Sequence, residues 1–558
     1  MDKEKVEELK DKLFNKKESG WILANKKEDI FEYAKGYIDF MNKSKTEREI
    51  IKSSKQIAEK NGFKNIEEIE NLKPGDKVYY INREKSMYLA VIGKEGIEKG
   101  VNIIGAHADS PRLDLKPNPL YEDGELAYFK THYYGGIKKY QWTTIPLSIH
   151  GVIVKSNGEK IEVNIGEDEN DPIFTITDLL PHLAQDQMEK KLKNGIDGED
   201  LNLLIGSIPY AEGVPEAVKL NILNILNQKY GITEVDFLSS ELELVPAMKC
   251  RSMGFDESMV AGYGQDDKIC VYTELTALMD IQGTPNKTAA CIISDKEEIG
   301  SMGNTGMESH VFDMFMAEIL NKLGVNKPDL LEKVFCNSKM LSADVDAGFD
   351  PIYASVSDRN NAGFMGRGIA LNKYTGARGK SGASDANAEF VAEVRKIFED
   401  NDIRYQITEL GKVDIGGGGT IAYILANKGI DVIDCGVSVL SMHAPYEVTS
   451  KFDLYEAYRG YKAFWERWCL KNLILFQIEN EKLKKAKKKG ANSNLSACSF
   501  YKVHFELCVF HKEHILSYPL HSGWGQTVVI IRLQGIEILP FILWELLLCR
   551  SVAESGVI

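Results

Sequence analysis

The strongest constraint on the fold is a repeated order of segments after Pro246, in which a helical pattern precedes an apolar run that ends in acidic residues or histidine. The helical patterns cover residues 269–279, 311–323, 383–401 and 421–429. Strands that alternate with helices of this length predict an α/β fold with a mixed, largely parallel sheet flanked by helices. Ligands bind beyond the carboxyl ends of such strands, so we expect function directly after each apolar run.

The chain before this region divides into two parts of different character. Residues 1–70 have the apolar spacing of helices, and "KVYYINREKSMYLAVIG" and "VNIIGAHADS" indicate three strands. Residues 118–245 mix glycine-rich turns with alternating strands such as "IHGVIVKS". A chain of 558 residues is long enough for two or three domains. We therefore predict a discontinuous α/β domain of residues 1–117 and 246–470, interrupted by a β-rich domain of residues 118–245.

Histidines and carboxylates follow the predicted strands at the positions where ligands are expected. These residues are His107, Asp109, Asp266, Asp267, Glu297, Glu298, Asp344 and His443. Because each follows an apolar run, we expect them to converge on one edge of one sheet.

This set of residue types suits a pair of metal ions. Nitrogen and oxygen ligands without thiolate favour zinc, manganese or cobalt. Two ions about 3.5–4 Å apart need a bridging carboxylate, and each then takes one histidine and one further carboxylate. One of Glu297 and Glu298 would be a ligand and the other a general base. Taken singly, a histidine after a strand is more often a packing residue, and an Asp pair before a helix can cap it, worth about 1 kcal/mol.

Several motifs in order resemble one known family. "HADSPRLDLKP", "YGQDD", "DKEEIGSMG", "SADVD", "ASDA" and "SMHAPYEV" are similar to the motifs of the aspartyl aminopeptidase and vacuolar aminopeptidase I family of dinuclear zinc exopeptidases, in its bacterial branch. The similarity extends from about residue 30 to residue 470. It implies a zinc-exopeptidase-like α/β domain with an inserted β-rich dimerisation domain. It also implies homo-oligomers in which dimers assemble into a dodecamer.

The resemblance also implies a role for each motif residue. Glu297 would be the general base, and Asp109 would orient the site. The implied metal ligands are His107, Asp266, Glu298, Asp344 and His443, with Asp266 as the bridge. They would hold two divalent ions, Zn²⁺ or alternatively Mn²⁺ or Co²⁺. The implied reaction is removal of single residues from peptides with a free N-terminus.

The sequence departs from the family in the inserted region. It has "GGIKKYQWTTIPL" where the family usually carries G-G-G-I-W-x-T-W-F-D-R-D-L. A family histidine that a neighbouring subunit supplies falls at Asp186 here, and His182 or His132 would have to replace it.

The substrate pocket is less defined by the sequence. Gly417 and Gly418 in "DIGGGGT" are candidates to offer backbone N–H groups to the substrate, and the alternative is a flexible turn that starts a helix. Arg367, Lys373 and Arg378 are candidate cations for an acidic side chain, and each has the alternative of being a solvated surface charge. The preferred N-terminal residue stays open between acidic, neutral and apolar.

Charge and hydropathy exclude other classes of partner. The net charge of −14, without a basic cluster, argues against nucleic acid. The N-terminal stretch lacks the apolar core of a secretory signal, and no segment before the tail reaches membrane-spanning length, so we expect a cytoplasmic protein that does not bind a membrane. The nine cysteines include no Cys-x-x-Cys pair and are expected to be small buried hydrophobes.

The tail, residues 471–558, has a different composition. A lysine-rich run, "ENEKLKKAKKKGANSN", precedes an apolar stretch without clear period. We expect a non-native extension, such as a shifted reading frame, with a small appended domain or a membrane-contacting end as alternatives. Two alternative functions of the whole chain remain open: a catalytically silent self-assembling scaffold, and a dinuclear hydrolase of acylated amino acids.

Overall fold

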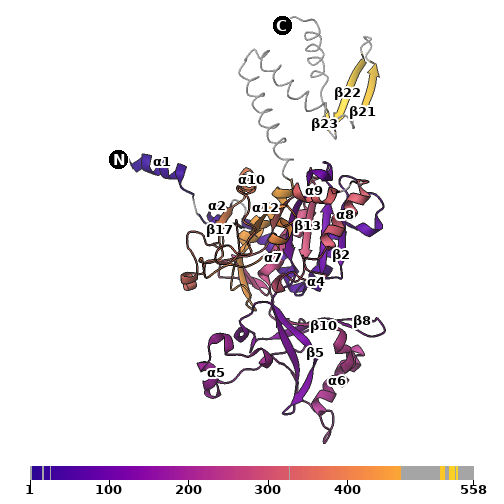
Figure 1. The fold of residues 1–558 in the computed structure, drawn as a ribbon, viewed down its shortest axis with the longest axis vertical. Coiled ribbons are helices and arrows are strands. Elements are labelled where there is room, and N and C mark those ends of the chain that lie inside the picture. Colours follow the sequence, from indigo (N-terminus) through magenta and orange to yellow (C-terminus); the bar gives the residue numbers. More distant parts are fainter. Residues whose placement is uncertain are drawn as a thin grey trace. The chain divides into compact units, whose positions relative to one another are not determined.

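The computed structural model describes residues 3–15, 18–24, 27–325, 327 and 329–466, and three strands in the tail (Figure 1). Met1–Leu470 form one compact unit and Lys471–Ile558 a second. The tail strands pair antiparallel and are β21 (Leu516–His521), β22 (Thr527–Leu533) and β23 (Ile536–Glu537). Apart from these strands, the prediction of a non-native extension lies outside the described residues.

A nine-stranded mixed sheet is the centre of the first unit. In spatial order its strands are β1 (Lys64–Asn65), β2 (Lys77–Asn82), β3 (Ser86–Val91), β13 (Ala289–Ser294), β4 (Asn102–His107), β14 (Lys339–Ser342), β18 (Asp431–Gly436), β16 (Ile369–Asn372) and β17 (Tyr405–Thr408). The four central strands, β13, β4, β14 and β18, are mutually parallel. This confirms the predicted α/β fold with a largely parallel sheet.

Helices cover both faces of this sheet, because successive residues of its buried strands point to opposite sides. Ile104 and Ile293 pack in one apolar core, while their neighbours Ile103 and Ile292 pack in another. The helices in the first core are α3 (Lys27–Lys43), α4 (Glu47–Lys60), α7 (Gln265–Met279), α10 (Ala388–Asp400) and α12 (Lys451–Glu466). Those in the second are α8 (Val311–Lys322), α9 (Leu330–Cys336) and α11 (Ala422–Ala426). Two short helices, α1 (Lys3–Leu13) and α2 (Gly20–Leu23), precede them.

A six-stranded antiparallel sheet lies in the region predicted to be β-rich. In spatial order its strands are β8 (Lys160–Ile165), β7 (Leu147–Val154), β10 (Ser240–Pro246), β5 (Arg112–Asp123), β6 (Leu126–Tyr134) and β9 (Leu203–Gly206). This sheet has its own apolar core, to which the helix α6 (Ala217–Tyr230) contributes. A short helix, α5 (Gln185–Glu189), lies before β9 in the chain. The division of this unit into an outer and an inserted domain remains a prediction.

A third, five-stranded sheet corrects the expectation that the candidate residues share one edge of one sheet. Its strands are β11 (Arg251–Met253), β12 (Met259–Gly262), β20 (Glu447–Ser450), β19 (Ser438–Leu440) and β15 (Asp346–Ala347). Asp266 follows β12 and His443 follows β19, so both come from this sheet. The apolar run before His443 is divided at Gly436, where a Cβ would lie 1.7 Å from the Asp344 carbonyl oxygen. The chain leaves the large sheet there and enters the smaller one.

Two further expectations concern cysteines and membrane spans. Of the cysteines in the described region, Cys250, Cys270, Cys291 and Cys435 are free and buried, as predicted, whereas Cys336 is exposed. Among the described helices, none has both the length and the apolar composition needed to cross a bilayer.

Candidate metal centre

Two groups of potential metal ligands share one carboxylate. The first group is His107, Asp266 and Asp344, and the second group is Asp266, Glu298 and His443. Within each group the ligand atoms lie within 4.8 Å of one another. Nε2 of His107 is 3.2 Å from one Asp266 oxygen, and Nε2 of His443 is 3.2 Å from the other. Asp266 therefore has the position of a bridging carboxylate between two sites.

The two adjacent glutamates, Glu297 and Glu298, differ in their position relative to the ligand groups. Both lie on a single 3₁₀ turn, Glu297–Ile299, that follows β13. Glu298 belongs to the second group, and its carboxylate is 3.5 Å from Nε2 of His443. Glu297 belongs to neither group, but its carboxylate is 3.9 Å from Nε2 of His107. This arrangement places one glutamate among the ligands and leaves the other beside them.

Asp109 fixes the relative positions of a ligand and the glutamate turn. Its two carboxylate oxygens accept the backbone N–H groups of Glu297 at 3.1 Å and Glu298 at 3.2 Å. Nδ1 of His107 is 2.9 Å from the Asp109 carbonyl oxygen, a contact of the kind that orients a metal-binding imidazole. The Tyr134 hydroxyl donates to the Asp109 carboxylate at 2.9 Å. Tyr134 ends β6 of the six-stranded sheet and lies outside the sequence motifs that point to the site.

The environment of His443 contains a second residue without a predicted role, Glu447. Nδ1 of His443 is 2.9 Å from the Gly136 carbonyl oxygen. The backbone N–H of His443 donates to the Glu447 carboxylate at 2.7 Å, and that of Asp266 donates to its other oxygen at 3.2 Å. Glu447 lies in the "SMHAPYEV" motif, so the signal was present in the sequence, but its partner Asp266 is 181 residues away.

Burial and mutual proximity shift the pKa values of the carboxylates and of His443 in the cluster. Burial raises the pKa of Glu297 to about 7 and the pKa of Glu298 and Asp344 well above the usual range of a carboxyl group. Although burial opposes it, close contact with the two histidine rings holds the pKa of Asp266 well below its usual range. Despite its own burial, contact with Asp266 and Glu298 raises the pKa of His443 to about 10.

These features fit divalent cations as ligands of the cluster. Oδ1 of Asp266 and Oε1 of Glu298 are buried and have no hydrogen-bond partner. A buried carboxylate without a partner is costly, and a metal ion would satisfy it. Several carboxylates also face only two imidazoles, so added positive charge would balance the cluster. The donor set, nitrogen and oxygen without sulfur, suits zinc.

The cluster is open to solvent mainly at one ligand. The side chain of His443 is 35% exposed, whereas that of Asp266 is 6% exposed. The Glu297 side chain is 17% exposed. A substrate would therefore approach from the side of His443 and Glu297.

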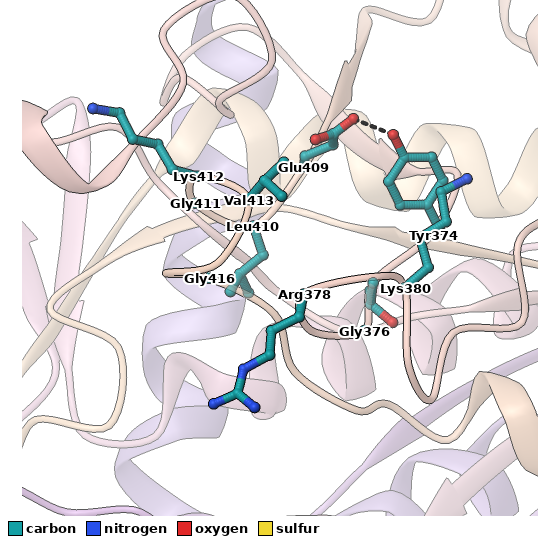
Figure 2. Close-up of a pocket in the computed structure, with 11 residues that line it drawn as sticks. Tyr374, Gly376, Arg378, Lys380, Glu409, Leu410, Gly411, Lys412, Val413 and Gly416 are labelled. Atoms are coloured by element: carbon teal, nitrogen blue, oxygen red, sulfur yellow. Dashed lines mark hydrogen bonds between the residues drawn. The ribbon is translucent and has the colours of Figure 1, made fainter.

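The glycine-rich loop around Gly417 and Gly418, which is predicted to contact substrate, does not bring charged side chains together (Figure 2). It borders a shallow depression lined by Tyr374, Gly376, Arg378, Lys412 and Gly416, among others. Figure 2 shows that Arg378 and Lys412 point away from each other rather than toward a common centre. This geometry does not gather cations around a ligand.

The other predicted pocket residues have partners within the protein. Gly417 has φ +122° and a Cβ there would lie 2.0 Å from the Gly376 carbonyl oxygen, while the Gly418 carbonyl accepts the Gly376 N–H at 2.9 Å. Lys373 Nζ is 3.9 Å from the Asp385 carboxylate. The Arg367 guanidinium lies 4.1 Å from the centre of the Phe364 ring.

The candidate replacements for the histidine of a neighbouring subunit lie on the surface of the described chain. His132, His182 and Asp186 are all exposed. Nδ1 of His132 is 2.8 Å from the carbonyl oxygen of Tyr133.

Comparisons of the sequence and of the structure with known proteins agree on one family. The model of the aminopeptidase I zinc metalloprotease (M18) family matches residues 40–465. The probable M18 family aminopeptidase 1 of Clostridium acetobutylicum is 54% identical over 441 residues, which cover 78% of this chain and 95% of that protein.

Solved structures show the same relationship. The crystal structure of aminopeptidase I from Clostridium acetobutylicum aligns with a TM-score of 0.76 at 51% identity, covering 81% of this chain and 100% of that one. The M18 aminopeptidase from Thermotoga maritima aligns with a TM-score of 0.79 at 46% identity, with the same coverage of both chains. The mApe1 dodecamer of Saccharomyces cerevisiae shares the fold, with a TM-score of 0.64 at 22% identity over 80% of this chain and 98% of that one. The chain belongs to the aminopeptidase I zinc metalloprotease (M18) family and is a metal-dependent aminopeptidase.

Proposed function

We propose that this aminopeptidase uses two divalent ions per chain, Zn²⁺ or alternatively Mn²⁺ or Co²⁺, to remove single residues from peptides with a free N-terminus. The observation that carries the proposal is the position of Asp266 in both ligand groups. Asp266 would bridge the ions, with His107 and Asp344 completing one site and Glu298 and His443 the other. When bound, such ions polarise the scissile carbonyl and acidify a water molecule.

Glu297 is the general base of this proposal. Its carboxylate takes a proton from the attacking water and returns it to the leaving amine, so that no net proton is gained or lost by the enzyme. Three observations support this role: Glu297 is outside both ligand groups, it lies beside His107, and burial raises its pKa to about 7, close to neutral pH. Asp109 holds the backbone of Glu297 by accepting its N–H.

The carboxylates around the cluster also favour an exopeptidase. The free α-amine of a peptide would lie near one ion and the neighbouring carboxylates, and in its neutral form it could donate its lone pair to that ion. A hydrolase of acylated amino acids would bind a substrate without this free amine. The intact ligand set argues against a silent scaffold, which needs no metal.

We further propose that the protein is a cytoplasmic homo-oligomer, in which residues 118–245 form dimers that assemble into a dodecamer. Exposed apolar side chains in this region support an interface. They include Ile173, Leu179, Leu180, Leu183, Met188 and Leu192. His132 or His182 would then reach the site of a neighbouring subunit. Light scattering of the purified protein measures the assembly, and a monomeric particle would contradict this part of the proposal.

The experiment that tests the activity is release of amino acids from dipeptides that begin with Asp, Glu, Leu, Met or Lys. Each dipeptide is tested as purified, after chelation, and after zinc, manganese or cobalt is restored. N-acetylated versions of the same dipeptides are the matched control. Metal-dependent cleavage of the free dipeptides alone is expected. Cleavage of the acetylated forms, or no cleavage with any metal by folded protein, would contradict the proposal.

A further inference from the structure

Two ligands of the cluster stand on irregular backbone that leaves their N–H groups without regular partners. His443 has φ +64°, in the left-handed region. Asp266 is at the start of α7 but has non-helical angles, φ −79° and ψ 106°. The N–H groups of a first helical turn have no partner within the helix. A buried N–H without a partner is costly, so each of these two groups needs a separate acceptor.

Glu447 supplies both acceptors with one side chain. Its Oε1 accepts the N–H of His443 at 2.7 Å, and its Oε2 accepts the N–H of Asp266 at 3.2 Å. Glu447 is 1% exposed and stands on β20, opposite Gly262 in the antiparallel ladder with β12. The carboxylate therefore joins the chain after β12 to the chain before β20, and these are the two segments that carry the bridge and the exposed histidine.

Resting on the proposed dinuclear site, we propose that Glu447 is a positioning residue that holds Asp266 and His443 in one fixed relation and thereby sets the affinity of the second group for its ion. Glu447 is not itself in either ligand group. Outer residues that orient metal ligands typically change metal affinity by about 10- to 100-fold when they are altered. Because the second group contains both residues that Glu447 holds, its ion is the one affected most.

Glu447→Gln tests the proposal with the smallest change of shape. The amide keeps one acceptor oxygen but replaces the other with an NH₂ group, which then faces the N–H of either Asp266 or His443. Two donors cannot bond to each other, so one of the two backbone positions loses its partner.

The chain offers a closely matched control. Asp453 is also fully buried, and its two carboxylate oxygens accept the backbone N–H groups of Gly366 at 2.7 Å and Gly368 at 2.6 Å. It is outside both ligand groups. Asp453→Asn therefore makes the same chemical change to the same kind of double acceptor without touching a ligand.

The measurement is calorimetric titration of zinc into the metal-free, full-length protein, with circular dichroism to check folding. We expect Glu447→Gln to weaken binding of one of two ions by about 10- to 100-fold, and Asp453→Asn to stay within about threefold of the wild type. The visible spectrum of the cobalt-loaded protein should change in Glu447→Gln alone. A purely structural role would instead lower the thermal stability of both variants equally and leave zinc affinity unchanged.

Wild-type zinc affinity in Glu447→Gln, or equal losses in both variants, would overturn the proposal. If Glu447→Gln does not fold, Glu447→Asp takes its place, because its shorter side chain keeps two acceptors but cannot reach both N–H groups. Wild-type affinity in Glu447→Asp would then overturn it. A wild-type protein that binds no zinc would instead contradict the proposed function.

Discussion

The candidate metal centre and the two glycine-rich loops, residues 373–387 and 409–420, are both dense in residues that can do chemistry, but their structures differ. At the metal centre the side chains come from the ends of buried strands and are aimed at one another, with Asp266 shared by two groups. In the glycine-rich loops, Arg378 and Lys412 are exposed and Lys373 is half-buried, and Arg378 and Lys412 diverge (Figure 2). The comparison shows that attachment to a rigid buried element, rather than residue type, makes side chains converge.

Removing the metal should give the largest contrast between the two regions. Chelation is expected to abolish dipeptide hydrolysis and to lower the melting temperature, because ions that bind only the folded state stabilise it by about 2.7 kcal/mol each when present at 100 times Kd. Differential scanning fluorimetry with and without chelator measures the shift. Arg378→Ala, in the loop, should show the same shift as the wild type. A melting temperature that does not change on chelation would show that bound metal does not stabilise the folded protein.

Glu297→Gln should have the next largest effect. We expect kcat to fall by about 10²- to 10⁴-fold, the usual contribution of a general base, with zinc content unchanged. Its neighbour provides the control, since Glu298→Gln should lower the zinc content. Steady-state kinetics and elemental analysis of both variants separate the two roles. Equal loss of zinc in the two variants would contradict the separation of base from ligand.

Tyr134→Phe should have an intermediate effect, because it removes one hydrogen bond to Asp109. Such a bond contributes about 1 kcal/mol, or somewhat more to a charged acceptor, so we expect kcat/KM to fall about tenfold. Tyr461→Phe is the matched control, since its buried hydroxyl donates to the Cys435 carbonyl at 2.6 Å. Equal effects of both variants on kcat/KM would show that Tyr134 acts only through general stability.

Substitutions in the glycine-rich loop should have the smallest effect. Lys373→Ala and Arg378→Ala are expected to change kcat/KM by less than about fivefold on all five dipeptides, because Arg378 is exposed and an ion pair such as that of Lys373 with Asp385 contributes about 0–1 kcal/mol. Assays on the same panel measure this. A selective loss on Asp- and Glu-initiated substrates would break the comparison, because it would give the loop a role in recognising acidic residues.

Much of the fold was predictable because its strands are buried on both sides. The run before Glu297 has no polar alternation, as expected for a central parallel strand, and becomes β13 (Ala289–Ser294). Helix α8, Val311–Lys322, matches its predicted range to one residue. The helix predicted over 383–401 begins only at Ala388, since Asp385 has φ +45° and the N-cap residue Asn387 has extended angles. The apolar run before His443 gave no sign that Gly436 divides it between two sheets.

The candidate site was predictable only where its residues follow apolar runs. The structure brings together all five expected ligands, including two that stand on a different sheet from the others. Tyr134 and Glu447 were missed because their roles depend on tertiary contacts. Tyr134 resembles any aromatic strand residue, and Glu447 any strand carboxylate, until the strands are placed beside Asp109 and Asp266.

The Gly136 carbonyl that contacts Nδ1 of His443 has a consequence for protein engineering. The turn after β6 is part of the region predicted to serve assembly, but together with Tyr134 it contacts two residues of the metal centre. A minimal enzyme made by deleting residues 118–245 would leave His443 and Asp109 without these partners. The predicted assembly module therefore cannot be exchanged freely between relatives, because any graft must reproduce this turn as well as the subunit interface.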